Sequence, residues 1–406
     1  MKLNLPDGSD VKNRNSHTQR FPGFEDGELK GWGAHHTARE IAQQPQLWLD
    51  TWRLLNEKKE ALSAFLSKAY QHSSLNVILT GAGTSAFIGN ALQGAFQKNT
   101  GHYTVAIATT DLISHPAHYF MGKVTLLISF ARSGDSPESV AAFNLANELC
   151  ENVFHLIITC NPDGKLASAK SNNPSFVFLL PPEGDDQSLV MTGSFTAMLL
   201  TGLLISRIEE LEALKSTVIQ LTEYAAHIFN DYANKLRSVA KLGFQRAVFL
   251  GSGPLRAAAN EADLKLQELT AGKVICKFDS FLGFRHGPKA VINADTLLVY
   301  LFSNNEYVHR YEQDLVKSIA AGEKGLFTIA ITEKINKNLD VDLSIELSTN
   351  GTRVDEEFLS VCSVLPAQIL GFYKCLEFGL QPDNPSETAT ITRVVKGVTI
   401  YPFPFL

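Results

Sequence analysis

The sequence predicts an α/β fold of two tandem doubly wound domains, each with a parallel sheet flanked by helices. From residue 76 the chain alternates short apolar runs, rich in β-branched residues, with longer helical patterns, which is typical of parallel sheets. The pattern then recurs, because residues 246–253 (RAVFLGSG) repeat residues 76–83 (NVILTGAG) after 170 positions. Residues 296–305 likewise echo residues 125–134 after 171 positions. This near-constant offset indicates two copies of one domain.

The strands expected in the first copy are short apolar runs between residues 76 and 180. A helical pattern, residues 136–149, follows the third of them, and the two copies join within the helical stretch of about 195–240. The five runs are NVILTG (76–81), YTVAIATT (103–110), VTLLISF (124–130), VFHLIIT (153–159) and SFVFLL (175–180). We expect an N-terminal arm and helix over 1–50, a first domain over 51–215, a second domain over 216–380 and a tail over 381–406.

Composition excludes several classes of protein. The 406 residues are 45% hydrophobic and 19% charged, as in ordinary globular domains, and the net charge of -6 argues against a nucleic-acid surface. No apolar run approaches the roughly 20 residues of a membrane span, and the N-terminus lacks the apolar core of a signal peptide. The five cysteines are scattered without a CxxC pair, which disfavours a disulfide framework or a zinc site. We therefore expect a cytoplasmic protein with neither nucleic acid nor membrane as partner.

The segment from His36 to Glu40 allows two interpretations. Thr37 and Glu40 have the spacing of a capping box, in which Glu40 reaches back to the Thr37 amide. His36 and Glu40 are four residues apart and could instead ligate a metal. Capping is the simpler interpretation because no further ligands lie nearby in sequence, and we expect no metal site.

The loop after the first strand, GAGTS (81–85), starts like a dinucleotide-binding turn, with Gly81, Gly83 and Ala86 at the required spacing. That turn also needs an acidic residue about 20 positions on, at the end of the second strand. Here Asp111 comes 28 residues after Gly83, and Pro254 removes an amide donor from the equivalent loop of the second copy. The phosphate of a small molecule is therefore a better ligand for this loop than NAD.

A second loop, RSGDS (132–136), follows the third strand and leads into a helix with Pro137 in its first turn. Backbone amides, hydroxyls and the positive end of a helix dipole suit an anion. The alternative is that Ser136 only caps its helix. Because ligands of open α/β sheets lie at the carboxyl ends of the strands, two such loops on neighbouring strands favour phosphate binding.

These motifs resemble a known family. GAGTS, SFARSGDSPES and GFRHGPKAVI are similar to the sugar isomerase (SIS) domain, which is flavodoxin-like and stands here in tandem. From about Thr37 the chain resembles the isomerase half of glucosamine-6-phosphate synthase. The resemblance is strongest to the galactosamine-6-phosphate deaminase/isomerase family (AgaS type), also known as tagatose-6-phosphate ketose/aldose isomerases. It rests on SGDSPES, NPDG, MTGSFT, LGSGPLRAAANEADLKLQELT, FRHGP and GVTIYPFP.

The resemblance implies three catalytic residues. Glu268 matches the glutamate that moves a proton between C1 and C2 of the sugar, whereas Glu261 and Lys265, on the same helical face, are interpreted as a salt-bridged, solvated face. His286, in a Gly-Pro turn, matches the histidine that assists ring opening in the neighbouring subunit's site, which implies a homodimer with shared active sites. Lys396 matches a lysine at the sugar's reactive end, although it could equally be a solvent lysine on an edge strand.

The resemblance also implies which residues bind substrate. Arg132 replaces a glutamine of the synthase, Ala131 stands where the family usually has serine, and Gly193 replaces a lysine. The phosphate ligands expected are Gly83, Thr84, Ser85, Arg132, Ser133, Gly134 and Ser136. Further candidates for substrate contact are Ser188, Leu189 and Ser252.

The activity that the resemblance implies is conversion of galactosamine 6-phosphate and water to tagatose 6-phosphate and ammonia, without any cofactor. Residues before position 37 are too few for the synthase's glutaminase half, so ammonia release is the expected direction. Aldose–ketose isomerisation of a neutral hexose 6-phosphate is the alternative reaction. A phosphosugar-binding regulator is a third hypothesis, but such proteins normally carry a DNA-binding or partner-docking domain, and neither is evident here.

Overall fold

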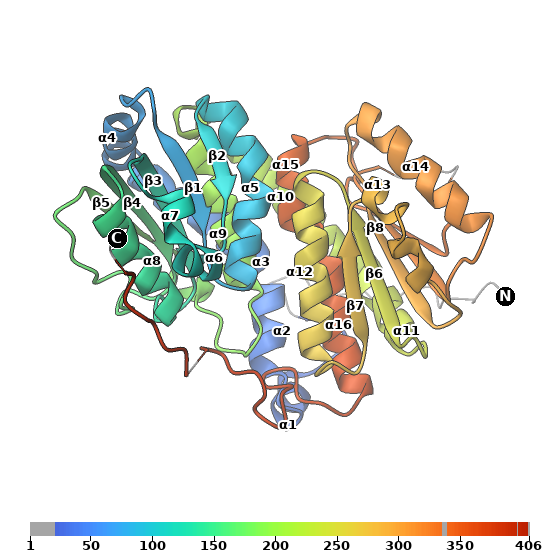
Figure 1. Cartoon of the computed structure of the whole chain (residues 1–406). Coiled ribbons are helices and arrows are strands. Elements are labelled where there is room, and N and C mark those ends of the chain that lie inside the picture. Colours follow the sequence, from blue (N-terminus) through green and yellow to red (C-terminus); the bar gives the residue numbers. More distant parts are fainter. Residues whose placement is uncertain (1–20, 335–338, 396, 405–406) are drawn as a thin grey trace. The chain divides into compact units, whose positions relative to one another are not determined.

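The computed structural model describes residues 21–334, 339–395 and 397–404. By compactness the chain divides into two units, each built from segments that are far apart in sequence (Figure 1). Unit 1 takes its described residues from 1–49, 186–193 and 216–387, and unit 2 takes them from 50–185, 194–215 and 388–406. Each unit contains one five-stranded sheet. The domain boundaries expected at residues 50, 215 and 380 stay predictions.

The sheet of unit 2 confirms the predicted parallel arrangement. All of its strand pairs are parallel, in the order β2-β1-β3-β4-β5, which is the doubly wound order 2-1-3-4-5. All eight residues of β3 are buried, as expected for the central strand of a sheet covered on both faces. The strands are β1 (Asn76–Thr80), β2 (Tyr103–Ala106), β3 (Val124–Ala131), β4 (Asn152–Thr159) and β5 (Ser175–Leu179).

Helices cover both faces of this sheet. Successive residues of a strand point to opposite faces, so neighbouring residues of β1 show which helix lies on each face. Ile78 packs in a buried cluster with Ala142 and Ala146 of α8. Leu79 faces α5, where a Cβ at Gly89 would lie only 3.1 Å from the Leu79 Cβ. The helices of unit 2 are α4 (Lys59–Tyr70), α5 (Thr84–Thr100), α6 (Thr109–Ser114), α7 (Pro116–Tyr119), α8 (Pro137–Leu149) and most of α9 (Gly193–Ser206), with most of α3 (Gln44–Glu57).

Unit 1 repeats the same topology, which confirms the tandem prediction. Its parallel strands lie in the order β7-β6-β8-β9-β10. The loop glycines match as well, since Gly83 has φ 56° and ψ -128° and Gly253 has φ 52° and ψ -126°. The strands are β6 (Arg246–Gly251), β7 (Ile275–Asp279), β8 (Thr296–Leu301), β9 (Phe327–Thr332) and β10 (Leu343–Glu346).

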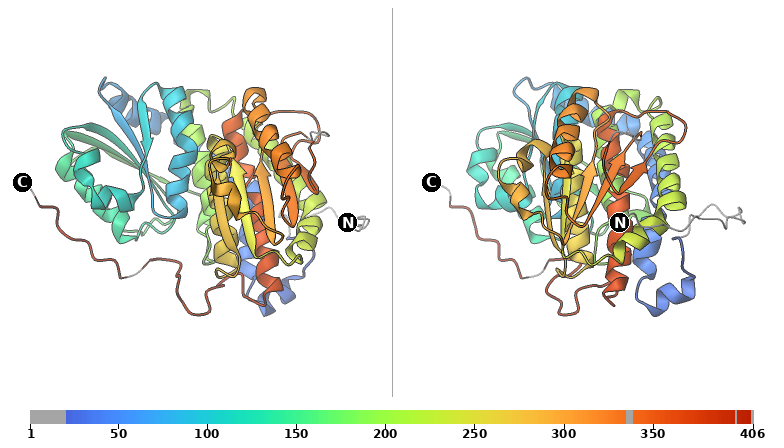
Figure 2. Two further views of the ribbon diagram at one scale, coloured as in Figure 1. Left: turned by 45° about the vertical axis from the view of Figure 1, so that its right-hand side comes forward. Right: turned by 90° about the vertical axis from the view of Figure 1, so that its right-hand side faces the viewer.

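Helices also flank the sheet of unit 1 on both faces (Figure 2). Leu315 and Val316 of α14 pack with Val248 and Leu298 on one side, whereas α12 lies on the other side (Figure 1). The helices of unit 1 are α1 (Asp26–Gly31), α2 (His35–Ala42), α10 (Lys215–His227), α11 (Ala233–Ala240), α12 (Pro254–Leu269), α13 (Phe281–Phe284), α14 (Glu306–Ala320), α15 (Glu356–Cys362) and α16 (Leu365–Glu377).

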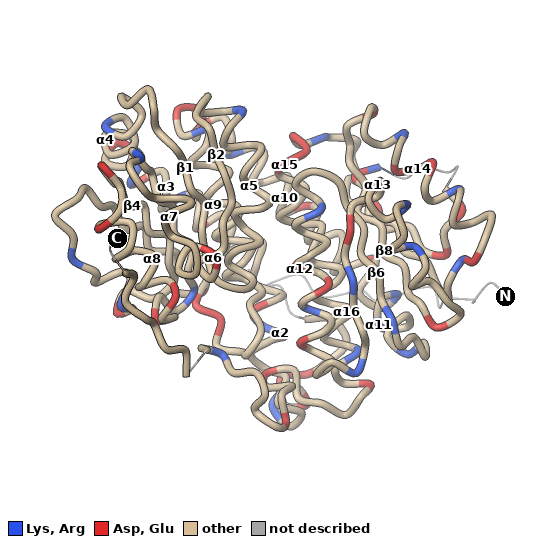
Figure 3. The backbone as a smooth tube through the Cα atoms, in the orientation of Figure 1, with Lys and Arg blue, Asp and Glu red and all other residues tan. Residues whose placement is uncertain are grey.

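One stretch of the described chain, Glu356–Glu377, is long and apolar enough to cross a membrane, with a mean hydropathy of 1.4. It corresponds to α15 and α16, and 94% of its apolar window is buried inside the protein. These residues therefore serve as core helices of unit 1. Acidic and basic residues are interspersed along the described backbone of both units (Figure 3).

The capping box expected at Thr37 is wrong. Helix α2 already begins at His35, and the Thr37 amide donates to Oδ1 of Asp383 at 2.7 Å. Glu40 instead accepts from the backbone amide of Gln187 at 2.6 Å and from the Ser188 hydroxyl. The partners of Glu40 thus lie in a loop that is distant in sequence, and not at the start of its own helix.

Candidate active site

The first phosphate-loop candidate, GAGTS, connects β1 to α5. A Cβ at Gly81 would lie 2.6 Å from the backbone carbonyl carbon of Ser85, so only glycine allows this tight turn. Gly83 has a positive φ of 56°, which glycine adopts without strain. Thr84 and Ser85 follow in the first turn of α5, where the positive end of the helix dipole favours an anion. The loop is thus a tight, glycine-dependent turn that leads directly into a helix N-terminus.

The second loop, RSGDS, connects β3 to α8 at the same edge of the sheet. Strands β1 and β3 are hydrogen-bonded neighbours and parallel, so both loops leave from adjacent carboxyl ends. Ser136 makes no side-chain capping bond, and its hydroxyl lies 2.6 Å from the Ser139 hydroxyl. The capping interpretation of Ser136 is therefore not supported by the geometry of its side chain.

Residues 161–166 after β4, which begin with the NPDG motif (161–164), form hydrogen bonds to this second loop. Asn161 Nδ2 donates to the carbonyl oxygen of Ser133 at 2.9 Å, and the Leu166 amide donates to the carbonyl oxygen of Gly134 at 2.9 Å. Gly134 itself has a φ of 68°. The sequence identified NPDG only as a family motif. Its contact with the second loop could not be predicted without knowing that β3 and β4 are neighbouring strands.

Arg132 contacts the C-terminal tail within unit 2. Its side chain is buried, with 6% exposure, and its Nη2 donates to the carbonyl oxygen of Arg393 at 2.5 Å. Arg393 in turn forms an ion pair with Asp185, with 2.6 Å between Nη2 and Oδ1. The tail, dark red in Figure 2, contains no helix or strand over residues 388–395 and 397–404. This pair of contacts fixes one point of an otherwise irregular segment beside the RSGDS loop.

On α12 of unit 1, Lys265 bridges two carboxylates. Its Nζ lies 2.6 Å from Oε2 of Glu268 and 3.3 Å from Oε1 of Glu261. The predicted ion pairing is confirmed, but the prediction of a solvated face is wrong, because Glu261 and Lys265 are fully buried. The Glu268 side chain is 22% exposed. The Glu268 carboxylate is thus partly accessible, and the buried ammonium group of Lys265 holds it in position.

Burial and charge act in opposite directions on Lys265. Burial lowers the pKa of the ammonium group, but the carboxylates of Glu261 and Glu268 outweigh it and raise the pKa above its ordinary value. Lys265 therefore stays charged. A signal in the sequence could have located it, because Leu255, Ala258, Ala262, Leu266 and Leu269 define the buried stripe of α12, on which Glu261 and Lys265 also lie.

His286 lies in the turn that follows α13. The Ser280 hydroxyl caps this short helix by accepting from the Gly283 amide at 2.9 Å, and Gly287 continues the turn with a φ of 112°. His286 is exposed on the chain. Its imidazole is therefore free of the core, as its position in a Gly-Pro turn suggested.

Ser188 is a buried residue whose hydroxyl donates to Glu40. Burial and the nearby Asp186 carboxylate raise the pKa of Glu40 to about 7, against the lowering effect of its bonds from Ser188 and Gln187. The Leu189 amide donates to the carbonyl oxygen of Asp383. The structure thus places Ser188 and Leu189 in a loop anchored to α2 and to the segment after α16.

The remaining candidates are distributed over the two units. Ser252 precedes the positive-φ Gly253 in the loop between β6 and α12. Lys396 lies outside the described residues. The phosphate-loop candidates come together in unit 2, whereas Glu268 and His286 belong to unit 1. No group of three His, Cys, Asp or Glu residues that could hold a metal occurs within 21–334, 339–395 and 397–404.

The two repeated sheets and the glycine–serine loops define a tandem SIS protein, and the SIS domain family matches residues 70–206. D-galactosamine-6-phosphate deaminase AgaS from Shewanella sp. (strain ANA-3) is 39% identical over 93% of this chain and 94% of its own length. The enzyme of that name from Escherichia coli is 36% identical over 90% of this chain and 96% of its own. The chain therefore belongs to the AgaS family of galactosamine-6-phosphate deaminases, which are enzymes.

Solved structures agree with this assignment. The tagatose-6-phosphate ketose/aldose isomerase from Escherichia coli aligns with a TM-score of 0.83 and 35% identity, covering 91% of this chain and 96% of that one. The C-terminal domain of glucosamine-fructose-6-phosphate aminotransferase from Francisella tularensis aligns with a TM-score of 0.72 at 16% identity, over 86% of this chain and 98% of that one. The second similarity shows a shared fold only.

Proposed function

We propose that the protein converts galactosamine 6-phosphate and water to tagatose 6-phosphate and ammonia. The observation that carries this proposal is the partly exposed Glu268 carboxylate held at 2.6 Å by the buried Lys265. A fixed carboxylate that solvent or substrate can reach is suited to take a proton from carbon and return it to the adjacent carbon. The names of the relatives at 36–39% identity supply the substrate.

The proposed chemistry begins with ring opening, in which His286 accepts the proton of the C1 hydroxyl and donates a proton to the ring oxygen. Glu268 then removes the C2 proton of the open aldehyde, and the carbonyl oxygen at C1 takes a proton from solvent to give an enolamine. Glu268 returns its proton to C1, which leaves a protonated ketimine at C2 that gives the added proton back to solvent. Water adds to this carbon, ammonia leaves, and the C2 ketone of tagatose 6-phosphate remains.

The phosphate is proposed to bind in unit 2, on the amides of residues 83–85 and 132–134 with the hydroxyls of Thr84, Ser85, Ser133 and Ser136. Adjacent helix N-termini at one sheet edge support this assignment. The buried guanidinium of Arg132, at the start of the RSGDS loop, is proposed to contribute positive charge to the phosphate site. Ser188, Leu189, Ser252 and Lys396 are proposed to complete the substrate site.

We further propose a cytoplasmic homodimer with shared active sites, without nucleic-acid or membrane partners. The exposure of His286 supports sharing, because an imidazole outside its own core is available to a second subunit. The test mixes Glu268→Gln protein with His286→Asn protein. Shared sites restore roughly a quarter of wild-type activity, because half of the dimers formed are mixed and each of these regains one intact site. No recovery in demonstrably mixed dimers would disprove sharing.

The substrate assignment is tested with a panel of galactosamine 6-phosphate, glucosamine 6-phosphate, galactose 6-phosphate and tagatose 6-phosphate, scored for ammonia and for ketose phosphate. Galactosamine 6-phosphate should give both products in equal amounts. Interconversion of galactose and tagatose 6-phosphates without ammonia release from any amino sugar would establish the isomerase alternative instead. Binding of sugar phosphates without turnover of any of them would leave only a regulatory role.

A further inference from the structure

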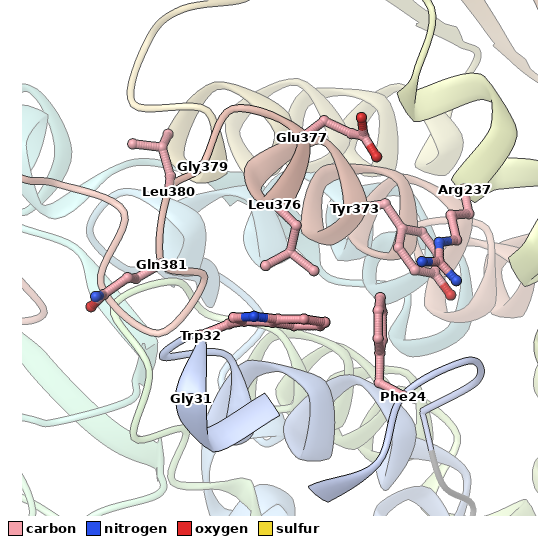
Figure 4. A pocket seen from close by; sticks show the side chains of 10 residues that line it. All are labelled: Phe24, Gly31, Trp32, Arg237, Tyr373, Leu376, Glu377, Gly379, Leu380 and Gln381. Atoms are coloured by element: carbon pink, nitrogen blue, oxygen red, sulfur yellow. The ribbon is translucent and has the colours of Figure 1, made fainter. Parts of the chain in front are cut away.

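A cavity of about 530 Å³ lies in unit 1 between α1, α11 and α16, on residues that the proposed reaction does not use. Its volume is in the range of roughly 300–1,000 Å³ that small-molecule sites occupy. Its walls combine the aromatic rings of Phe24, Trp32 and Tyr373 with the charged groups of Arg237 and Glu377. Figure 4 shows the Trp32 ring facing Leu376 across the cavity, with Arg237 beside Tyr373.

The Trp32 indole provides a stacking surface. It is 42% exposed, although tryptophan is usually well buried, and Phe24 holds it edge-on with 5.2 Å between ring centroids. A flat ring placed between Trp32 and Leu376 would cover both apolar surfaces. Stacking of a nucleic-acid base on an aromatic side chain stabilises binding and tolerates any base.

Arg237 provides an anion receptor in the same cavity. Its guanidinium stacks on Phe24 at 4.7 Å and on Tyr373 at 5.9 Å from the ring centroids. Within the described chain it forms no ion pair and no hydrogen bond, so its five N–H donors remain available. A stacked, half-buried guanidinium of this kind is preorganised for phosphate.

Two further groups narrow the choice of ligand. Glu377 and Gln381 also line the cavity. Their side-chain oxygens can accept hydrogen bonds, so they suit a ligand with amino or hydroxyl donors. The Glu377 carboxylate disfavours a bare polyanion such as inorganic phosphate. A ring to stack, one phosphate and several donors together describe a nucleoside monophosphate.

We propose that this cavity is a regulatory site for a nucleoside monophosphate, whose base stacks on Trp32 and whose phosphate binds Arg237. A route to the reaction exists inside unit 1. Leu380 lines the cavity and also belongs to a buried cluster with Leu269, the residue after Glu268. A ligand that moves Leu380 therefore alters the packing at the end of α12 through this cluster.

Binding is tested by fluorescence titration of the full-length protein with AMP, adenosine and ribose 5-phosphate. Trp32 should report binding, because the other two tryptophans, Trp48 and Trp52, are 0% and 6% exposed. AMP should quench the emission, and adenosine should bind at least about tenfold more weakly because it lacks the charge-assisted bonds to Arg237. Ribose 5-phosphate should leave the emission unchanged. Equal quenching by ribose 5-phosphate, or no quenching by AMP, would overturn the proposal.

Variants assign the ligand groups, with calorimetry as the readout. Trp32→Ala and Arg237→Gln should each weaken AMP binding at least about tenfold. Arg53→Gln, which removes an exposed arginine on α3, is the matched control and should bind AMP like the wild type. Retained AMP affinity in both cavity variants would overturn the site assignment, and a melting curve for each variant separates lost binding from lost folding.

Regulation rests on the proposed function and is measured as ammonia release with and without AMP. Saturating AMP should change KM or kcat by about fivefold or more, which is the lower range of coupling between sites. Trp32→Ala should keep the basal rate and lose the response. AMP binding without any change in rate would overturn the regulatory role. Failure of the proposed deamination would instead appear as no ammonia at any AMP concentration, while the binding results would stand.

Discussion

Lys265 Nζ lies 2.6 Å from Oε2 of Glu268, and this buried ammonium group also holds Glu261 at 3.3 Å. Replacing Lys265 with methionine would leave the fully buried Glu261 carboxylate without its counter-charge. Breaking a buried pair in this way costs about 3–5 kcal/mol in the free energy of unfolding. Lys277→Met is the control, because that side chain is 38% exposed and lies 4.0 Å from Asp279. Equal losses in urea denaturation would contradict the prediction.

Substitution of Glu268 by glutamine should abolish proton transfer while preserving the fold. The amide has almost the same shape and can still accept from Lys265, but it cannot take the C2 proton. We expect kcat for ammonia release to fall by roughly 10²–10⁴-fold, as is typical of a lost general base. Glu223→Gln, at an exposed position on α10, should have no effect. Near wild-type turnover in Glu268→Gln would exclude this residue as the base.

Ser85→Ala should act on substrate binding rather than on chemistry. Ser85 lies in the first turn of α5, where its hydroxyl is proposed to donate to the substrate phosphate. Loss of one hydrogen bond to a charged group, about 1.5–3 kcal/mol, should raise KM by roughly tenfold or more with kcat little changed. Ser114→Ala, at the exposed end of α6, provides the matched control. The phosphate assignment fails if KM is the same in both variants.

Glu40 should make stability depend on pH. Its folded pKa of about 7 lies above the ordinary 4.5, so the folded state holds a proton that the unfolded state releases between these values. The contribution of this proton to the free energy of unfolding is fully present below pH 4.5 and is lost as the pH rises through 7. Relative to Glu40→Gln, the wild type should lose about 3 kcal/mol between pH 4.5 and 8.

The measurement for Glu40 is urea denaturation of wild type and Glu40→Gln at both ends of this pH range. Glu57→Gln, an exposed carboxylate at the end of α3, should follow the wild-type pH dependence. A difference between wild type and Glu40→Gln that does not change with pH would show that Glu40 is ionised throughout.

Arg132→Gln should loosen the C-terminal tail. The variant loses the 2.5 Å bond to the carbonyl oxygen of Arg393, which anchors a segment without helix or strand. Limited proteolysis after Arg393 should become several-fold faster, because cleavage follows the population of locally opened states. Arg53→Gln should leave the rate unchanged. Unaltered cleavage in Arg132→Gln would mean that this bond does not hold the tail.

Much of the fold follows from patterns that act within short stretches of the chain. Short apolar runs between helical patterns located all five strands of the first sheet. The repeat at 170 residues predicted the second sheet with its matching loop glycines. The glycines of GAGTS were recognisable because the turn before the helix leaves no room for a Cβ at Gly81 and needs a positive φ at Gly83. Such features need only neighbouring residues to determine them.

Tertiary structure decided the partners of the charged side chains. Spacing alone could not show that Glu40 binds Ser188 instead of capping α2, or that Arg132 reaches the carbonyl of Arg393. Each of these partners comes from a segment far away in sequence, and α16, which packs on α12, is likewise distant from it in the chain. The sequence alone therefore determined the sheets and their loops, because backbone geometry is local, whereas packing between distant segments decided which charges are buried and what they hold.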